Sequence, residues 1–332
     1  MAAFGRAATA LEHRLYADAR RPGVAYAIGC LGYTLVLGQL AARAARRVPA
    51  RGAQTGVVAL AAWTVLGGAS LARAADPVAL ALGRGDVEAA RDGLRALCAR
   101  DPSTLDTVDL ARASVESVAE NTSDAVVAPL LWGAVGGVPG LLGYRAINTL
   151  DAMVGYRSAR YQRFGWASAR LDDVVNWVPA RVTAALTVLL APLVGGDARG
   201  ALQVWRRDGA KHPSPNAGRC EAAFAGALGL RLGGCNTYDG YLEDRPSLGE
   251  GRRPTAADIQ RAIRLSRLVG AAATIASAVL ATALATALAQ HQPRRDHAIH
   301  HRRGVLGDPQ RIAAVVATEI HCGSPGVGRM RA

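Results

Sequence analysis

Five apolar segments, separated by polar stretches rich in arginine, dominate the pattern of hydrophobic and polar positions along this chain. A run of roughly 20 apolar residues is long enough to cross the ~30 Å hydrocarbon core of a bilayer as a helix. The pattern therefore predicts an all-α, multi-pass helical membrane protein with about four to five apolar segments. These segments lie near residues 23–42, 56–72, 126–144, 182–196 and 268–289.

Two long polar regions, residues 77–109 and 201–267, interrupt the apolar pattern and are predicted to be mainly helical. In the second region we expect Thr255 to cap a helix that enters the last apolar segment. We expect a single membrane domain over residues 1–290. The basic, histidine-rich stretch over residues 291–332 is predicted to be a disordered tail.

The third apolar segment raises a question of topology. If residues 126–144 cross the membrane once, the polar residues before and after them face opposite sides, and one site cannot easily use both. Pro129 and the glycine-rich run 136–140 would allow a helix pair that dips in and returns. Irregular backbone at that depth must be buried in protein or line a wet cavity. The alternative is a site formed partly within the helix bundle.

Composition narrows the class of partner. The formal net charge is +13, but aromatic residues make up only 5% of the chain and no basic run is interleaved with them. Nucleic acid is therefore not an expected partner. Arginine that flanks apolar segments indicates membrane topology and contact with lipid. The five cysteines form no C-x-x-C pair, which excludes a disulfide framework or a zinc site of ordinary spacing.

An acidic stripe precedes the third segment. Glu116, Glu120 and Asp124 would share one helix face at intervals of four residues, with Asn121 beside them. Three carboxylates in a row repel each other unless a cation lies among them, and oxygen ligands of this kind suit Mg²⁺. A solvated acidic face is the alternative.

Two further polar motifs follow the third segment. Asn148 and Asp151 are spaced to meet on one helix face, although a simple helix cap is an equal alternative. Asp172, Asp173 and Asn176 form the second motif. The arginines near these motifs are candidates to clamp a phosphate or carboxylate, with plain Arg–Asp pairing as the alternative. They are Arg157, Arg170 and Arg181.

A basic loop completes the candidate chemistry. Arg206 and Arg207 precede Lys211, which is the only lysine in the chain, and Asn216 ends the rigid run after it. His212 is the first candidate for a general base, because histidine titrates near neutral pH. No G-x-x-x-x-G-K-[ST] motif occurs, so a P-loop is excluded.

Several long motifs, in order, resemble the CobD/CbiB family of cobalamin biosynthesis. They are ESVAENTSD (116–124), YRAINTLDAMVGYR (144–157), FGWASARLDDVVNWVPAR (164–181), KHPSPNAGRCEAAFAGAL (211–228) and LGGCNTYDG (232–240). The resemblance covers roughly residues 3–289. It implies a membrane enzyme that converts adenosylcobyric acid to adenosylcobinamide or its phosphate. ATP-dependent amide formation with (R)-1-amino-2-propanol or its phosphate is the implied reaction.

The resemblance points to motifs, and the roles within them are hypotheses. ATP and Mg²⁺ are expected beside the corrinoid substrate, in a cell-membrane protein with a site that faces the cytoplasm. Other late cobalamin-pathway membrane enzymes are expected partners. We assign catalysis to His212, Asp172 and Asp173, and metal binding to Glu116, Glu120 and Asp124. The expected substrate- and phosphate-binding residues are Arg157, Arg170, Arg181, Arg206, Arg207, Lys211, Asn121, Asn148, Asp151, Asn176, Asn216 and Tyr238.

Two other functions remain open at this point. A Mg²⁺-dependent membrane phosphotransferase of the CDP-alcohol type also uses helix-borne aspartates, but Asp151, Gly155, Arg160 and Asp172 do not keep its spacing. A non-catalytic membrane scaffold or a corrinoid transporter would use polar residues to line a path. Two large polar regions with carboxylate, arginine and histidine motifs favour catalysis instead.

Overall fold

The structure is a computed structural model that describes residues 2–50, 52–98, 101–156, 158–238 and 241–291. It divides into two compact units, residues 1–280 and 281–332. The described elements are α1 (Ala2–Leu15), α2 (Arg20–Arg47), α3 (Ala53–Val65), α4 (Gly68–Gly83), α5 (Val87–Arg95), α6 (Thr107–Thr122), η1 (Ser123–Val127), α7 (Ala128–Leu150), η2 (Asp151–Gly155), α8 (Trp166–Val175), α9 (Trp177–Leu190), η3 (Ala191–Val194), α10 (Ala198–Asp208), α11 (Ala217–Leu228), β1 (Leu232–Tyr238), β2 (Tyr241–Leu248) and α12 (Ala256–His291).

The predicted all-α, multi-pass class is confirmed, because five helical stretches of the described chain are long and apolar enough to cross a membrane. The first and last predicted segments lie within α2 and α12. The second segment is split between α3 and α4 at Leu66, whose backbone is extended. The fourth comprises most of α9 and the short η3. The predicted tail from residue 292 onward lies outside the described residues.

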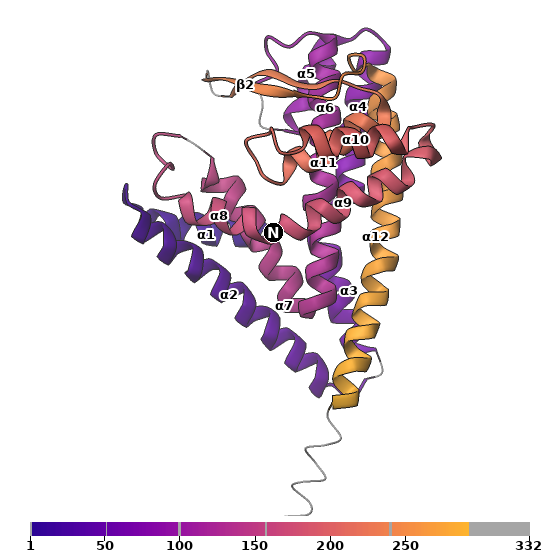
Figure 1. Cartoon of the computed structure of the whole chain (residues 1–332). Coiled ribbons are helices and arrows are strands. Elements are labelled where there is room, and N and C mark those ends of the chain that lie inside the picture. Colours follow the sequence, from indigo (N-terminus) through magenta and orange to yellow (C-terminus); the bar gives the residue numbers. More distant parts are fainter. Residues whose placement is uncertain (1, 51, 99–100, 157, 239–240, 292–332) are drawn as a thin grey trace, which may run out of the picture. The chain divides into compact units, whose positions relative to one another are not determined.

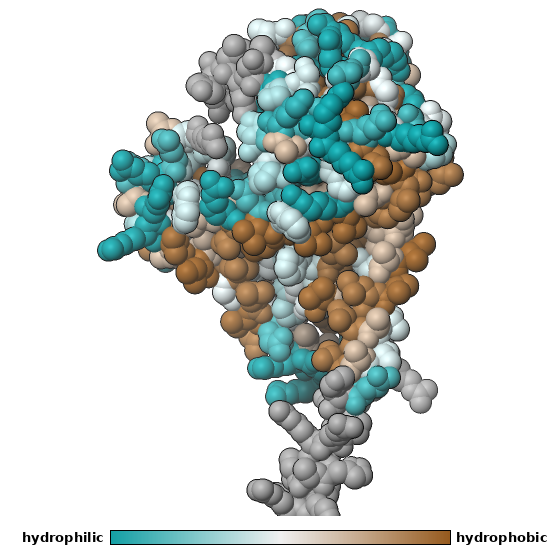
Figure 2. All heavy atoms as spheres, in the orientation of Figure 1, coloured by the Kyte–Doolittle hydropathy of each residue, from teal (hydrophilic) through white to brown (hydrophobic). Residues whose placement is uncertain are grey.

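Large apolar side chains are exposed along the candidate spans, as expected where lipid replaces water. Figure 2 shows this apolar surface gathered over the lower parts of the helices, whereas the end that carries α5, α6 and α10 is mostly hydrophilic. The exposed side chains include Ile28, Tyr33, Leu37, Val58, Trp63, Val135, Leu189, Ile275 and Val279. The hydrophilic end is therefore expected to lie outside the hydrocarbon layer.

Helix α7 consists of two helical arms that meet at a sharp turn. Gly137 has φ 58° and ψ −142°, a conformation that residues with a side chain rarely adopt. The arms then pack against each other closely, since a Cβ atom at Gly140 would collide with the backbone carbonyl of Trp132. Tyr144 Oη, on the second arm, donates to the Asp124 carbonyl oxygen at 3.1 Å. The third apolar segment is therefore a helix pair, as predicted; that the pair dips into the membrane and returns stays a prediction.

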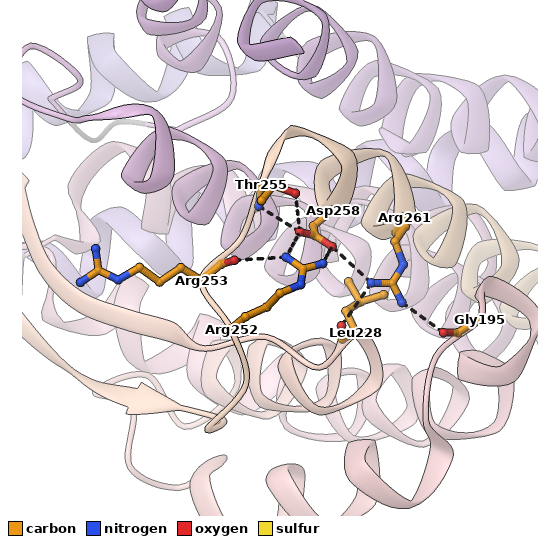
Figure 3. Close-up of polar contacts among 7 residues, drawn as sticks. All are labelled: Gly195, Leu228, Arg252, Arg253, Thr255, Asp258 and Arg261. Carbon is orange, nitrogen blue, oxygen red and sulfur yellow. Dashed lines mark hydrogen bonds and ion pairs between the residues drawn. The ribbon is translucent and has the colours of Figure 1, made fainter. Parts of the chain in front are cut away.

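An ionic network anchors the start of α12 (Figure 3). Asp258 is fully buried and accepts from both terminal nitrogens of Arg252, at 2.6 and 2.7 Å. It also accepts from the Thr255 backbone N–H and hydroxyl at 2.9 and 2.8 Å, so the residue predicted to cap this helix does lie at its start. Arg261 donates to Asp258 and to the Leu228 carbonyl oxygen, both at 3.2 Å. These bonds tie α12 to the end of α11.

The second polar region is not wholly helical. After α10 and α11 it forms an antiparallel hairpin, β1–β2, with an irregular register between Leu232 and Gly234. This hairpin was not predicted, because two positive-φ glycines, Gly233 and Gly234, break any alternating pattern. Leu232 and Leu248 are buried in the same core as Phe224 of α11, so the hairpin closes over that helix.

Helix α1 and the segment before α8 are held together by a buried glutamate. Glu12 accepts from Tyr161 Oη at 2.7 Å and from Arg160 Nη2 at 3.2 Å. Gly23, at the start of α2, lies directly against the backbone of Phe164. These contacts fix α8, which carries Asp172 and Asp173, beside the start of α2.

Candidate functional site

Chain reversal at Gly137 brings the acidic stripe and the later polar motifs to one place. Tyr144 Oη also lies 2.9 Å from Asn176 Oδ1, so its single proton is shared between this oxygen and the Asp124 carbonyl oxygen, and the side chains of Tyr144 and Asn176 are almost fully buried. The Trp132 indole donates to the Val175 carbonyl oxygen at 3.0 Å, so α8 is attached to both arms of α7. Motifs that are far apart in the sequence thus share one site.

Asp172 lies at the centre of an amide network. Asn176 Nδ2 donates to one of its oxygens at 2.9 Å, and Asn148 Nδ2 donates to the other at 3.5 Å. Arg145 Nη1 in turn donates to Asn148 Oδ1 at 3.1 Å. The predicted residues Asn148, Asp172 and Asn176 are therefore joined, and the two amides hold the carboxylate in one orientation.

Two other carboxylates of the site lie on π-helical turns. Asp124 falls in η1 and Asp151 begins η2, and π-helical turns inside α-helices are frequent at functional sites. The Asp151 side chain folds over Gly155 so closely that a Cβ atom there would collide with it. Both Asp124 and Asp151 interact electrostatically with Asp172 and Glu120. Four carboxylates thus share one electrostatic environment.

Burial raises the pKa of Asp172 to about 6, and the charges of Asp173 and Glu120 act in the same direction. The hydrogen bonds from Asn176 and Asn148 oppose this shift. Burial likewise raises the pKa of the Cys220 thiol, and the charge of Asp124 raises it further. Helix α11 therefore lies close to the acidic residues, and Asp172 titrates near neutral pH.

The basic loop joins this network through an asparagine. Asn216 Nδ2 donates to the Asp173 carbonyl oxygen at 2.8 Å, and its Oδ1 accepts from Arg181 Nη1 at 3.4 Å. Arg170, by contrast, pairs with Asp173 at 3.0 Å on an exposed surface, as the structural alternative expected. Asn216 and Arg181 thus belong to the site.

The acidic stripe is only partly retained as a potential metal site. Glu116 is buried and accepts from the Gly233 backbone N–H at 2.8 Å and from Arg112 at 3.4 Å, so it ties α6 to the β-hairpin. Among the described residues, no three His, Cys, Asp or Glu side chains gather closely enough to hold a metal ion. Glu120 and Asp124 remain, and Asn121 donates back to Ser117 at 2.9 Å.

His212 is buried against α11. Its Nδ1 accepts from the Ser214 backbone N–H at 3.0 Å, and its Nε2 lies 3.9 Å from Glu221 Oε1. A Cβ atom at Gly218 would collide with the histidine, so glycine is needed for this close packing. The burial of both ring nitrogens is typical of a residue that holds the loop, and it gives no support to the predicted role as general base.

The cations of the loop are largely neutralised within it. Arg207 donates to both oxygens of buried Asp208, at 2.9 and 2.7 Å, and Lys211 Nζ donates at 2.7 Å. These bonds hold the pKa of Asp208 well below its usual range, with Arg207 as the largest cause. Arg207 and Lys211 are thus engaged by Asp208 rather than available for phosphate, while Arg206 is exposed.

Two predicted residues cannot be placed. Arg157 lies outside the described residues, and Tyr238 is described only through its backbone in β1. No role is assigned to either side chain.

The comparisons with known proteins bear on this same set of motifs. The family model described as CobD/Cbib protein matches residues 1–266. The chain belongs to the CobD/Cbib family. The match includes every described residue of the site.

Relatives of the family named "Cobalamin biosynthesis protein CobD" cover most of the chain. One from Mycobacterium tuberculosis (strain ATCC 25618 / H37Rv) is 54% identical over 280 residues, which are 84% of this chain and 88% of the relative. One from Geobacter metallireducens is 44% identical over 287 residues, 85% of this chain and 90% of the relative. One from Stutzerimonas stutzeri is 45% identical over 270 residues, 80% of this chain and 85% of the relative. No solved structure matches the chain.

Two further residues of the candidate site were not predicted from the sequence. Tyr144 joins the acidic stripe to α8, and Arg145 holds Asn148. Both lie in the motif YRAINTLD, where Tyr144 is four residues and Arg145 three residues before Asn148. Helical spacing places Arg145 and Asn148 on one face, so the signal for Arg145 was present. The role of Tyr144 depends on the chain reversal within α7, which helical spacing does not indicate.

Proposed function

We propose that this protein is an enzyme of cobalamin biosynthesis that joins adenosylcobyric acid to (R)-1-amino-2-propanol or its phosphate. The product is adenosylcobinamide or its phosphate. The family membership and the printed names of the relatives support the pathway. One observation carries the proposal: the family's polar motifs, separated by an apolar segment, meet around Asp172.

Amide formation from a carboxylate requires activation, since oxide is a poor leaving group. In the proposed reaction, a carboxylate oxygen of the corrinoid attacks ATP at the γ-phosphorus and expels ADP, which gives an acyl phosphate, or attacks at the α-phosphorus and expels pyrophosphate, which gives an acyl adenylate. The amine nitrogen then attacks the acyl carbon, the bond from that carbon to the phosphate oxygen breaks, and phosphate or AMP leaves. One proton must be removed from the ammonium group before attack.

Asp172 is the proposed acceptor of that proton. A carboxyl group whose pKa lies near 6 is largely ionised at neutral pH and is still basic enough to assist proton transfer. Asn148 and Asn176 fix its orientation. The buried ring of His212 makes that residue a weaker candidate.

The residues present fit Mg²⁺ bound together with substrate phosphates. Mg²⁺ usually takes one or two carboxylates, with phosphates and water completing its shell. Glu120 and Asp124 would supply these carboxylates, because Glu116 is engaged elsewhere. Mg²⁺ would offset negative charge on the phosphates. The concentration of carboxylates around Asp172, with Arg145 as a nearby cation, supports this assignment.

We also propose that the protein resides in the cell membrane with this site facing the cytoplasm, where ATP is available. The apolar spans support a membrane location. Neighbouring enzymes of the late pathway would be natural partners, since the substrate and product are bulky and pass between reactions.

The test uses purified full-length protein in detergent with adenosylcobyric acid, ATP, Mg²⁺ and either amine, and it detects the condensed product by mass. Wild type and Asp92→Asn, which changes an exposed carboxylate on α5, should form product, whereas Asp172→Asn should form little. Equal turnover in Asp172→Asn, with unchanged melting temperature, would remove Asp172 as the base. Absence of product with both amines would favour the scaffold or transporter alternative.

A further inference from the structure

Two arginines beside the carboxylate cluster lie near each other. Arg181, on α9, and Arg219, on α11, flank a direct contact between these helices, because Cys220 Sγ lies 3.7 Å from the Ala180 carbonyl oxygen, and they repel each other as like charges. Among the described residues, neither guanidinium forms an ion pair with a carboxylate. Both side chains are half-buried, so water screens their repulsion less than it would at an open surface. Such a pair is stabilised when an anion lies between or beside the two groups.

Arg181 is held in one orientation by three contacts. Its guanidinium lies over the Trp177 ring, 4.0 Å from the centroid. Its Nη1 donates to the Trp177 carbonyl oxygen at 2.7 Å and to Asn216 Oδ1 at 3.4 Å. An arginine fixed in this way loses little conformational entropy when it binds a ligand.

The side chain of Arg219 gives a second, independent indication of a ligand. Its Nε is buried and has no hydrogen-bond partner among the described residues. Leaving a buried donor of a charged group unsatisfied is costly, and native proteins rarely tolerate it without a reason. The side chain passes close to Gly209, where a Cβ atom would lie 3.1 Å from Arg219 Cδ.

The other cations of the basic loop differ from this pair. Arg207 and Lys211 both donate to Asp208, and Arg170 pairs with Asp173. Their charge is already balanced by a carboxylate. Among the described residues, Arg181 and Arg219 have no such carboxylate; Arg206 also lacks one, but it is exposed, whereas this pair is half-buried.

We propose that Arg181 and Arg219 together bind a phosphate group of a substrate. Guanidinium groups match phosphate geometry with paired N–H donors. Asn216 connects the pair to α8, because it accepts from Arg181 and donates to the Asp173 carbonyl oxygen. This inference rests on the proposed function for the identity of the substrate, which is either ATP or the phosphorylated amine. Arg219 was not predicted from the sequence.

Calorimetry on the full-length protein in detergent tests the pair without turnover. The probes are ATP and aminopropanol phosphate, with free aminopropanol as the ligand that lacks phosphate. Arg219→Gln and Arg181→Gln should weaken binding of one phosphorylated probe by roughly 10- to 100-fold, the loss expected for a charge-assisted hydrogen bond. Arg219→Lys should retain part of the affinity. Arg199→Gln, an exposed arginine on α10, should bind both probes as wild type does.

The outcomes separate the sources of phosphate. A loss confined to aminopropanol phosphate assigns the pair to the amine substrate, and a loss confined to ATP assigns it to the nucleotide. Binding of both probes that is unchanged in both glutamine variants would overturn the proposal. Displacement of both probes by phosphatidylglycerol, but not by phosphatidylcholine, in the micelle would also overturn it in favour of a lipid headgroup. Phosphate binding that persists in a protein with no condensing activity would contradict the proposed function alone.

Discussion

Asp172 and Asp258 are both carboxylates held by named side chains, but their surroundings differ in charge. Asp258 accepts from Arg252, Arg261 and Thr255, so its negative charge is balanced by two guanidinium groups. Within the part of the chain that the structure describes, Asp172 accepts only from the neutral amides of Asn148 and Asn176, and it lies near other carboxylates.

This difference separates a structural carboxylate from the one proposed to react. Arginine partners stabilise the ionised form of Asp258 and use its lone pairs, which leaves little capacity for chemistry. Amide partners orient Asp172 without adding charge, and burial shifts its titration toward neutral pH. Asp208, with Arg207 and Lys211, belongs with Asp258 in this respect.

The largest expected effect is on activity at Asp172. Asp172→Asn should lower turnover by about 10²- to 10⁴-fold, because a positioned general base contributes on that order. The change keeps the size of the side chain, so the melting temperature should fall far less than it does for a variant of Asp258. Turnover within a factor of three of wild type would place Asp172 with the structural carboxylates.

The reverse pattern is expected at Asp258. Asp258→Asn should lower the free energy of unfolding by about 1–3 kcal/mol, since it weakens the charge-assisted hydrogen bonds that a buried carboxylate accepts from two partly exposed arginines. Thermal unfolding in detergent would measure this loss, with Glu250→Gln as the control, since Glu250 pairs with Arg207 at an exposed position. The control should cost about 0–1 kcal/mol. Similar losses in the two variants would contradict the role assigned to the Asp258 network.

The turn between the two arms of α7, which assembles the site, can be tested at two neighbouring glycines. Gly137→Ala should cost about 1–3 kcal/mol of stability, because its φ and ψ lie in a region that strains any residue with a side chain. Gly136→Ala is the matched control, since a Cβ atom meets nothing within 4 Å at either position. Any difference between the two therefore reports backbone strain. An equal cost would mean that the turn lies elsewhere.

The smallest expected effect is on the pH dependence of turnover. Asp172 must be ionised to accept a proton, so activity should fall about tenfold per pH unit below a pH of about 6. The same raised pKa means that protonated Asp172 stabilises the fold below about pH 4, and that this contribution is lost as the pH rises through 6. A pH profile of turnover for wild type should show this acid limb. Its presence in Asp172→Asn would assign the limb to another group.

Much of the fold could be predicted from hydrophobic pattern alone. The five apolar segments and the broken third segment follow from run length and from the glycines near 136–140. The β1–β2 hairpin was missed because its strands are short and interrupted by glycine. The Asp258 network was also missed, since it joins α12 to α11 through contacts that no local pattern indicates.

The candidate site was predicted less completely than the fold. Asn148, Asp172 and Asn176 were found because helical spacing places polar groups together. Glu116 was predicted from the same helical spacing, but its carboxylate accepts from Arg112 and from the Gly233 backbone N–H. The π-helical turn that begins at Ser123 also interrupts the α-helical spacing before Asp124. The sequence did not indicate the pairing of Lys211 with Asp208 or the burial of His212.

The central claim is that both polar flanks of the third apolar segment lie on one side of the membrane. Single cysteines at Ser103, before α6, and Ala159, after η2, test it in a cysteine-free background, since both positions are exposed. Ala50, exposed in the segment between α2 and α3, is the control for the opposite side. A membrane-impermeant maleimide applied to sealed vesicles should label Ser103→Cys and Ala159→Cys from the same side, and Ala50→Cys from the other. Labelling of Ser103→Cys and Ala159→Cys from opposite sides would contradict the single site.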